Sequence, residues 1–267
     1  MNRWYWLCPW LAVALAVAVL MLVGLTWWSA LFAALLLVCP VLVLWGMFIT
    51  RSKLDEPVVH THGMTMDWAV PIYDWYCPKL GLGPAFREAT LSYAALKAGE
   101  RVLDVGCGTG VLTRLAARAV GSAGHVIGID PGPAMLAVAR RNAAASRAEF
   151  RLAAIESLPF ANASFDIVLS SCMLHHLPPE VKSEGLCEVY RVLRPGGRLL
   201  VVDIDRPANP FWWLLCWPLL FFHFTAPNLR GEVPIYLSAA GFTPVTVRGR
   251  KGGLLTFWLA MKPTAGG

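Results

Sequence analysis

The feature that most constrains this chain is a run of 46 residues, Trp4 to Ile49, that contains no charged side chain. As one continuous helix the run would extend about 69 Å at about 1.5 Å per residue, whereas the hydrocarbon core of a bilayer is about 30 Å thick. A single membrane span therefore cannot use all of it. Residues 24–28, Gly-Leu-Thr-Trp-Trp, favour an interfacial turn, and we expect two spans at about 7–25 and 28–49.

Basic residues flank this run on both sides, Arg3 before it and Arg51 and Lys53 after it. Because cytoplasmic flanks carry the excess of Lys and Arg, both ends of the helical pair are expected in the cytoplasm. A cleaved signal peptide is the alternative, but the run is far longer than the apolar part of such a peptide. The sequence predicts a two-helix membrane anchor over residues 1–50, with everything after it facing the cytoplasm.

The amino-acid composition excludes further classes of protein. Hydrophobic residues make up 57% of the chain and charged residues 15%, which excludes a disordered chain and disfavours a wholly soluble one. The seven cysteines include no C-x-x-C pair, so neither a disulfide framework nor a metal site is expected. The net charge of +6 is spread along the chain, which does not predict a nucleic-acid partner but suits an anionic membrane surface.

After the anchor, residues 51–83 form a connector rich in proline and aromatic residues, and residues 84–267 alternate apolar β-type runs with helical patterns. This alternation predicts an α/β fold with a doubly wound, Rossmann-like parallel sheet. Strands are expected at 101–105, 125–130, 149–154, 165–171, 198–204, 243–248 and 254–262, and helices at 84–97, 110–120, 132–145, 179–193 and 231–240. Ligands of such sheets bind at the carboxyl ends of the central strands.

The first of these strands runs into a glycine loop, in which Gly106, Gly108 and Gly110 alternate with other residues before a helix begins. The third glycine of a dinucleotide-binding G-x-G-x-x-G is missing, and Asp104 within the strand would repel a pyrophosphate. That carboxylate suits an ammonium group instead. Asp130, at the end of the second strand, is spaced to accept hydrogen bonds from ribose hydroxyls. An ammonium and a ribose without phosphate describe S-adenosylmethionine.

Five segments in this order resemble the successive motifs of class I S-adenosylmethionine-dependent methyltransferases, most closely the UbiE-like group. They are residues 102–110, 127–130, 157–160, 164–168 and 193–197. The resemblance implies an enzyme with S-adenosylmethionine as its cofactor. It also implies a seven-stranded methyltransferase sheet whose last hairpin is reversed.

The resemblance further implies a cofactor site, assigned residue by residue. Its members are Asp104 at the methionine ammonium, Gly106, Cys107, Gly108 and Gly110 along the methionyl and ribose groups, Asp130 at the ribose, Pro131 and Met135 at the adenine, Ala154 and Ile155 beside it, and Ser171 near the sulfonium. One position departs from the family pattern, because Ala154 stands where relatives carry an acid that binds the adenine amino group. Glu156, two residues later, is a candidate substitute.

The methyl acceptor is indicated by a second uncharged stretch of 23 residues, Pro207 to Leu229, interrupted by Pro218. It is too short to span a bilayer comfortably, so it is either an interfacial or re-entrant lid or a buried core helix. In the resembling fold, an insertion here covers the acceptor pocket. An apolar lid beside a membrane anchor predicts a hydrophobic acceptor, a membrane lipid or an isoprenoid quinone. A small thiol or sulfide acceptor and a non-catalytic membrane protein remain the alternatives.

Transfer to a phenol or ring carbon usually needs a base, whereas a thiol needs at most the loss of a proton. The candidate bases are His175 and His176 after the fourth strand, His223 in the apolar stretch and His60 or His62 in the connector, with Asp203 and Asp205 as further options. Tyr73, also a candidate catalytic residue, and Tyr76 in the connector resemble the tyrosines that some relatives fold over the cofactor. Each also has a structural interpretation, the histidines as loop-holding or interfacial residues and Tyr73 as packing. The sequence leaves the oligomeric state open.

Overall fold

The computed structural model describes residues 59–264. The anticipated spans at 7–25 and 28–49 lie outside these residues. Between residues 59 and 264, no helix combines the length and apolar character needed to cross a bilayer. All described residues except the short 3₁₀-helix η2 (Asp67–Ala69) belong to one compact unit.

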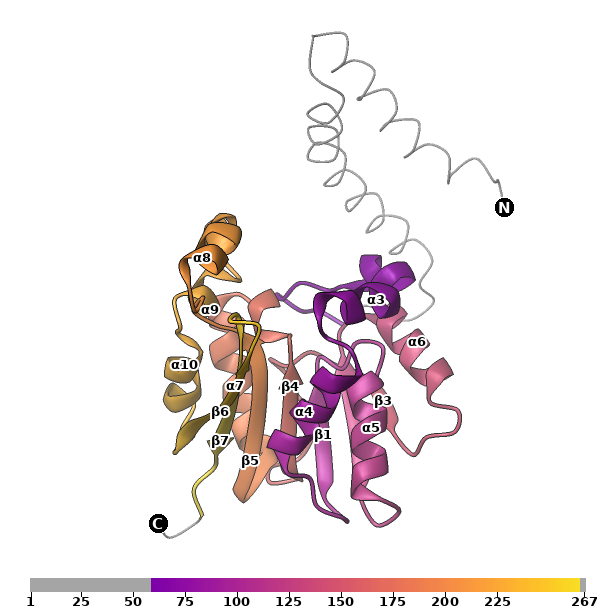
Figure 1. Ribbon diagram of the computed structural model, residues 1–267. Coiled ribbons are helices and arrows are strands. Elements are labelled where there is room, and N and C mark those ends of the chain that lie inside the picture. Colours follow the sequence, from indigo (N-terminus) through magenta and orange to yellow (C-terminus); the bar gives the residue numbers. More distant parts are fainter. Residues whose placement is uncertain (1–58, 265–267) are drawn as a thin grey trace, which may run out of the picture. The chain divides into compact units, whose positions relative to one another are not determined.

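The centre of this unit is a seven-stranded sheet in the order β3-β2-β1-β4-β5-β7-β6. The first five strands in the chain pair in parallel, whereas β7 runs antiparallel to both β5 and β6 (Figure 1). The expected methyltransferase sheet with a reversed last hairpin is therefore confirmed. The strands are β1 (Arg101–Val105), β2 (His125–Asp130), β3 (Glu149–Leu152), β4 (Phe165–Ser171), β5 (Leu193–Ile204), β6 (Val245–Lys251) and β7 (Leu255–Met261).

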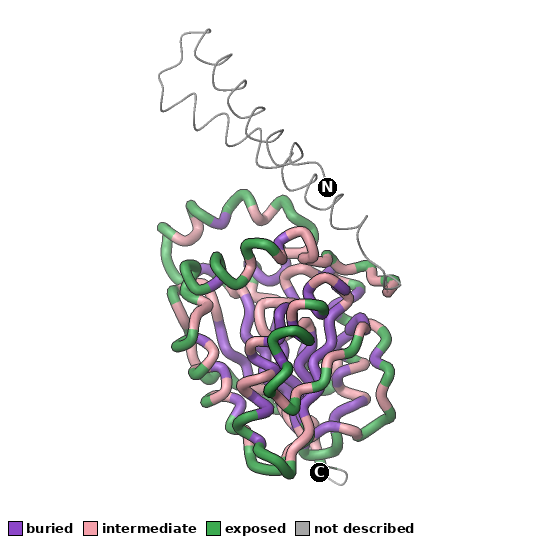
Figure 2. The backbone as a smooth tube through the Cα atoms, turned by 90° about the vertical axis from the view of Figure 1, so that its right-hand side faces the viewer, coloured by how far each residue is buried: buried purple, intermediate pink, exposed green. Residues whose placement is uncertain are grey.

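Helices cover both faces of the sheet, which explains why β1, β2 and β4 consist almost wholly of buried residues (Figure 2). α4 (Pro84–Ala94) and α5 (Val111–Val120) share one core cluster with the strands. α7 (Pro179–Val192) and α10 (Val233–Ala239) share the other. α6 (Pro133–Asn142) packs on β2 and β3.

Two of the boundaries that differ from the sequence prediction have local reasons. The helix expected at 84–97 ends at Ala94, because Ala95 takes a left-handed conformation (φ 47°) and its N–H caps the last turn. The strand expected at 198–204 begins already at Leu193, which pairs with Phe165 before the register shifts. The connector, for which no element was predicted, contains α3 (Val70–Tyr76) and the 3₁₀-helix η3 (Cys77–Leu80).

The uncharged stretch forms three short elements, α8 (Pro210–Cys216), the 3₁₀-helix η5 (Trp217–Phe221) and α9 (Ala226–Leu229). Pro218 lies where the α-helix gives way to η5. α9 is buried entirely, whereas most side chains of α8 and η5 are exposed. The interpretation as one buried core helix is therefore wrong for α8 and η5.

Candidate active site

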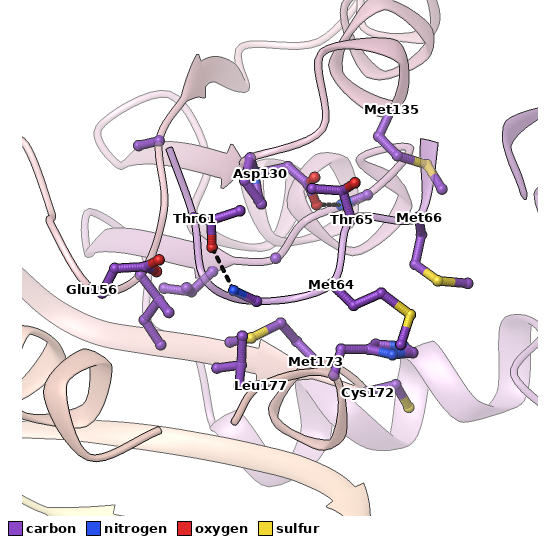
Figure 3. Close-up of a pocket in the computed structure, with 18 of the residues that line it drawn as sticks. Thr61, Met64, Thr65, Met66, Asp130, Met135, Glu156, Cys172, Met173 and Leu177 are labelled. Carbon is purple, nitrogen blue, oxygen red and sulfur yellow. Dashed lines mark hydrogen bonds between the residues drawn. The ribbon is translucent and has the colours of Figure 1, made fainter. Parts of the chain in front are cut away.

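A cavity of about 650 Å³ opens at the carboxyl ends of the parallel strands, beside the glycine loop that follows β1 (Figure 3). Its wall comes from that loop, from the ends of β2 and β4, and from a strip of the connector, residues 61–66. Eight of the residues expected in the site line it: Tyr73, Gly106, Gly108, Asp130, Pro131, Met135, Ile155 and His176.

Backbone amides fix the glycine loop and Asp130 against each other. The N–H groups of Gly106 and Cys107 both donate to the Ile129 carbonyl at 2.9 Å. The two carboxylate oxygens of Asp130 accept from the N–H groups of Gly108, at 2.9 Å, and Gly132, at 2.8 Å. The Asp130 carboxylate is thus held at the cavity wall, where it also remains able to accept hydrogen bonds from hydroxyl groups of a ligand.

Glycine is required at position 106 for two reasons. Its φ of +70° lies in the left-handed region, and a Cβ atom there would collide with the side chain of Met173. The backbone of the loop therefore approaches the interior of the cavity more closely than any other residue type would allow.

Asp104 lies beneath the loop, outside the cavity lining, and is almost completely buried. Its Oδ2 accepts a hydrogen bond of 2.6 Å from the Thr113 hydroxyl of α5. Burial raises the pKa of this carboxyl group to about 6, although the Thr113 hydrogen bond and the positive charge of Arg87 act in the opposite direction. Its contact with a ligand ammonium group stays a prediction.

The connector lies across the cavity. The Met64 N–H donates to the His176 carbonyl at 3.0 Å, and the His62 N–H donates to Glu156 Oε1 at 3.0 Å. In α3, the Tyr73 hydroxyl lies over the glycine loop, 3.7 Å from where a Cβ on Gly108 would stand. Residues far apart in the sequence therefore close one pocket.

A histidine–carboxylate pair lies behind His176. His175 Nδ1 is 2.6 Å from Asp203 Oδ1, and the Asp203 side chain is fully buried. Burial alone would raise the pKa of Asp203, but the charge and hydrogen bond of His175 and the Ile204 N–H hold it below its ordinary value. An ionised Asp203 accepts a hydrogen bond from His175 Nδ1–H and so fixes the orientation of the imidazole ring.

His176 has a different character. It lines the cavity, and its ring centroid lies 4.0 Å from that of His175. Burial, with the neighbouring His175 charge, lowers its pKa to about 3. His176 is therefore neutral at physiological pH and forms part of the wall, with little capacity to take up a proton.

The remaining expected residues lie apart from the cavity. His223 is exposed, 3.8 Å from Glu180. Cys107 is turned toward Gly128, and burial raises the pKa of its thiol well above the usual range. Gly110 begins α5, Ala154 is buried, and the buried hydroxyl of Ser171 has no hydrogen-bond partner among the described residues.

Sequence reasoning assigned the connector as a lid and named Tyr73, but it did not name the connector residues 61–66 that line the cavity. Met64 and Met66 line the cavity together with Met173 and Cys172 of the loop after β4. No local motif marks residues 61–66, because they are placed by hydrogen bonds to residues about a hundred positions away. Asp74, which accepts a hydrogen bond of 2.7 Å from the Thr109 hydroxyl, was missed for the same reason.

The pocket fits a nucleoside that carries a thioether or sulfonium chain. It combines a fixed acceptor at Asp130 with the flat apolar surfaces of Pro131, Met135 and Ile155, and a loop whose backbone comes close. One further polar atom is available, because Glu156 Oε2 is buried without a hydrogen-bond partner among the described residues. The fold and this pocket define a class I methyltransferase architecture.

Comparisons with known proteins also indicate a methyltransferase. A family model described as a methyltransferase domain matches residues 102–197. An arsenite methyltransferase of Halobacterium salinarum is 46% identical over 135 residues, which cover 49% of this chain and 33% of the relative. A ubiquinone/menaquinone biosynthesis C-methyltransferase UbiE of Hahella chejuensis is 38% identical over 135 residues, 49% of this chain and 53% of the relative. This chain thus spans between a third and about half the length of these two relatives.

An uncharacterized methyltransferase of Synechocystis is 35% identical over 173 residues, 64% of this chain and 79% of the relative. Among solved structures, a phosphoethanolamine N-methyltransferase of Haemonchus contortus, in complex with S-adenosylhomocysteine, matches with a TM-score of 0.58. It is 18% identical, over 74% of this chain and 58% of that chain, which shows the shared fold. The chain belongs to the S-adenosylmethionine-dependent methyltransferases.

Proposed function

We propose that this protein is a membrane-anchored enzyme that moves a methyl group from S-adenosylmethionine to a hydrophobic acceptor of the membrane lipid or isoprenoid quinone class. The observation that carries the proposal is the uncharged segment of α8 and η5, whose apolar side chains lie exposed near the cavity end of the sheet. The uncharged run Trp4–Ile49 supports it, as an anchor that places the catalytic unit at the cytoplasmic surface. The similarity to a quinone methyltransferase agrees with this acceptor class.

When bound, S-adenosylmethionine supplies an activated methyl group on a sulfonium. Asp130 accepts from the ribose hydroxyls, Asp104 balances the ammonium, and the glycine loop holds the methionyl chain. The connector strip 61–66 and Tyr73 lie over the pocket and exclude water from it. Because the transfer is an in-line displacement, fixing the acceptor in line with the methyl group supplies much of the rate.

His175 is proposed as the base. Asp203 holds its Nδ1–H at 2.6 Å, and Nε2 would take the proton that a quinol or other phenol-type acceptor loses as its ring carbon is methylated. His175 lies behind His176 and is not among the residues that line the cavity, so this role requires the acceptor or the loop after β4 to bring the two together. Asn228 in α9 donates to Asp203 at 3.3 Å, which links the base to the apolar segment above it.

A second candidate acceptor is a small soft nucleophile, such as a thiol or sulfide. Two observations favour it, namely Cys172 among the cavity-lining residues and the similarity to an arsenite methyltransferase. The two candidates differ in their need for a base. Removal of a proton by a positioned side chain contributes about 10²- to 10⁴-fold to the rate.

The test uses the full-length protein in lipid vesicles with methyl-labelled S-adenosylmethionine. Quinol, phospholipid, a small thiol and arsenite are offered in parallel, and label is followed into lipid, volatile and aqueous fractions. We expect label in the lipid fraction, and a loss of at least 100-fold in His175→Gln. If the label appears in the volatile fraction instead, and its amount in His175→Gln is within threefold of the wild-type amount, the acceptor is the small soft nucleophile. If no label moves although S-adenosylhomocysteine binds, both acceptor classes are wrong.

A further inference from the structure

Residues 211–222, which comprise most of α8, all of η5 and Phe222 after it, expose several large apolar side chains. Six are exposed, with Leu214 at 73% and Phe221 at 78%. The six are Phe211, Leu214, Leu215, Trp217, Phe221 and Phe222. No charged residue stands between them in the sequence, because Pro207–Leu229 contains none. Single exposed apolar side chains are ordinary, but six in one short segment are typical of a surface that meets a partner.

This surface belongs to a firmly held element. The Asn209 side chain caps α8 by accepting from the Trp212 N–H at 3.1 Å, and the Ala208 N–H donates to the Gly253 carbonyl at 2.9 Å. Gly253 has a φ of +74°, and a Cβ there would stand 2.9 Å from the Trp212 ring, so the β6–β7 turn and α8 fit closely. Cys216 anchors the inner side of the helix in the core.

The same turn reaches a second exposed apolar set, Trp75, Tyr76 and Leu80 of α3 and η3. A Cβ on Gly81, directly after η3, would lie 3.8 Å from Lys251 Cε. The β6–β7 turn therefore lies beside Trp212 of α8 and, through Lys251, beside Gly81 after η3. Figure 1 shows α8 and α3 at the same end of the sheet. Together, the six side chains of residues 211–222, these three and the turn form what we call the docking rim.

Cationic side chains accompany the docking rim. Lys79 Nζ lies 3.3 Å from the centroid of the Trp75 ring, and Lys251 lies at the turn. Arg206, just before the uncharged stretch, is exposed, and Arg250 binds Asp205 at 3.2 Å. Aromatic and aliphatic side chains bordered by Lys and Arg are the composition of surfaces that lie in the headgroup region of anionic bilayers.

We propose that the docking rim inserts its apolar side chains into the headgroup and upper acyl region of an anionic lipid bilayer. The 46-residue uncharged run favours this occupant, because a run of this length without charge is typical of membrane-spanning sequence, and residues 61–66, which come after it in the chain, line the cavity. This proposal extends the proposed function and rests on it, because transfer to an apolar acceptor is what gives the membrane contact a purpose. An apolar acceptor would pass from the lipid to the cavity beside the rim without crossing water.

The test places the photo-crosslinking residue p-benzoylphenylalanine at Leu214, at Phe221, or at Ile235 as a matched control. Ile235 is 67% exposed but lies on α10, away from the rim. The full-length protein is reconstituted in vesicles of phosphatidylcholine with about 30% phosphatidylglycerol as the anionic lipid. Lipid and protein adducts are then separated by mass spectrometry.

We expect lipid adducts at positions 214 and 221 and at least fivefold fewer at 235. Lys79→Gln combined with Lys251→Gln should lower the yield at 221 in anionic vesicles and leave it unchanged in purely zwitterionic ones. Adducts to a second copy of this chain at 214 or 221, or yields equal to that at 235, would overturn the proposal. The readout needs no methyl transfer, so a wrong acceptor assignment would leave it unaffected.

Discussion

At the scale of single residues, Asp104 links cofactor binding to pH. Burial raises the pKa of its carboxyl group to about 6, and an ammonium group is bound by the ionised form. Above about pH 7 the carboxylate is already ionised, so affinity for S-adenosylhomocysteine should be constant with respect to this group. Below pH 6 the affinity should fall towards tenfold per pH unit, because the ligand must displace a proton.

Calorimetric titration between pH 5 and 8 measures this dependence. Asp104→Asn should bind weakly throughout and show no inflection near pH 6. If the variant keeps the wild-type pH profile, Asp104 is not the group that meets the ammonium. Thr113→Val provides a milder comparison, because it removes only the hydrogen bond of 2.6 Å to Asp104 and should move the inflection upwards.

Glu156 is the second residue whose role can be isolated. Its Oε1 is occupied by the His62 N–H, whereas Oε2 is buried without a partner among the described residues. We expect Oε2 to accept from the adenine amino group, in place of the acid that Ala154 lacks. A hydrogen bond to a charged group contributes about 1.5–3 kcal/mol, so Glu156→Gln should weaken S-adenosylhomocysteine binding about 10-fold or more.

The decisive ligand is S-inosylhomocysteine, whose exocyclic carbonyl oxygen accepts a hydrogen bond where the amino group of adenine donates one. Wild-type protein should strongly prefer the adenosyl ligand, and Glu156→Gln should reduce that preference at least tenfold, because its amide can donate to the inosyl oxygen. Glu184→Gln, an exposed position on α7, is the matched control. An unchanged ratio of the two affinities in Glu156→Gln would exclude contact with the amino group.

At the scale of elements, the sheet could be predicted and the pocket wall could not. The strands at 101–105, 125–130 and 165–171 match the structure, because apolar runs between glycine and polar turns specify buried parallel strands. α3 has no buried residue and no apolar period, so nothing local indicates it. The strip 61–66 depends on distant partners, of which the Met64 N–H bond to the His176 carbonyl is one.

The apolar segment is joined to α7 through a buried lysine. Lys182 Nζ donates to the Phe224 carbonyl at 2.6 Å, and the residue is almost fully buried. Burial lowers the pKa of Lys182 to about 8, against the opposing effect of Asp203 and Glu232. Between this pKa and about 10.5 the unfolded chain holds more protons than the folded one, so this group makes stability rise with pH in that window.

Lys182→Met removes this dependence. The free energy of unfolding of the wild-type protein should rise relative to that of the variant by on the order of 3 kcal/mol between pH 8 and 10.5. Urea unfolding of both proteins in the same detergent, at matched pH, measures the difference. Arg118→Met on the surface-facing end of α5 controls for a general loss of positive charge. Parallel pH curves for wild type and Lys182→Met would contradict this, because they would mean that burial does not lower the pKa of Lys182 in the folded protein.

At the scale of the whole molecule, the proposed anchor, the proposed docking rim and the pocket together make one kinetic prediction. An enzyme held at a bilayer meets an apolar acceptor only within the surface, so its rate follows the mole fraction of acceptor in the lipid. The test uses full-length protein and a constant total amount of isoprenoid quinol, and adds inert detergent until the mole fraction of quinol in the surface falls tenfold. At subsaturating acceptor, the rate should then fall about tenfold. A quinol analogue without the isoprenoid chain, which is presented from water, should show no such decrease. If both acceptors respond only to bulk concentration, the acceptor reaches the cavity from solution. The apolar surface of α8 and η5 would then serve membrane attachment without delivering the substrate.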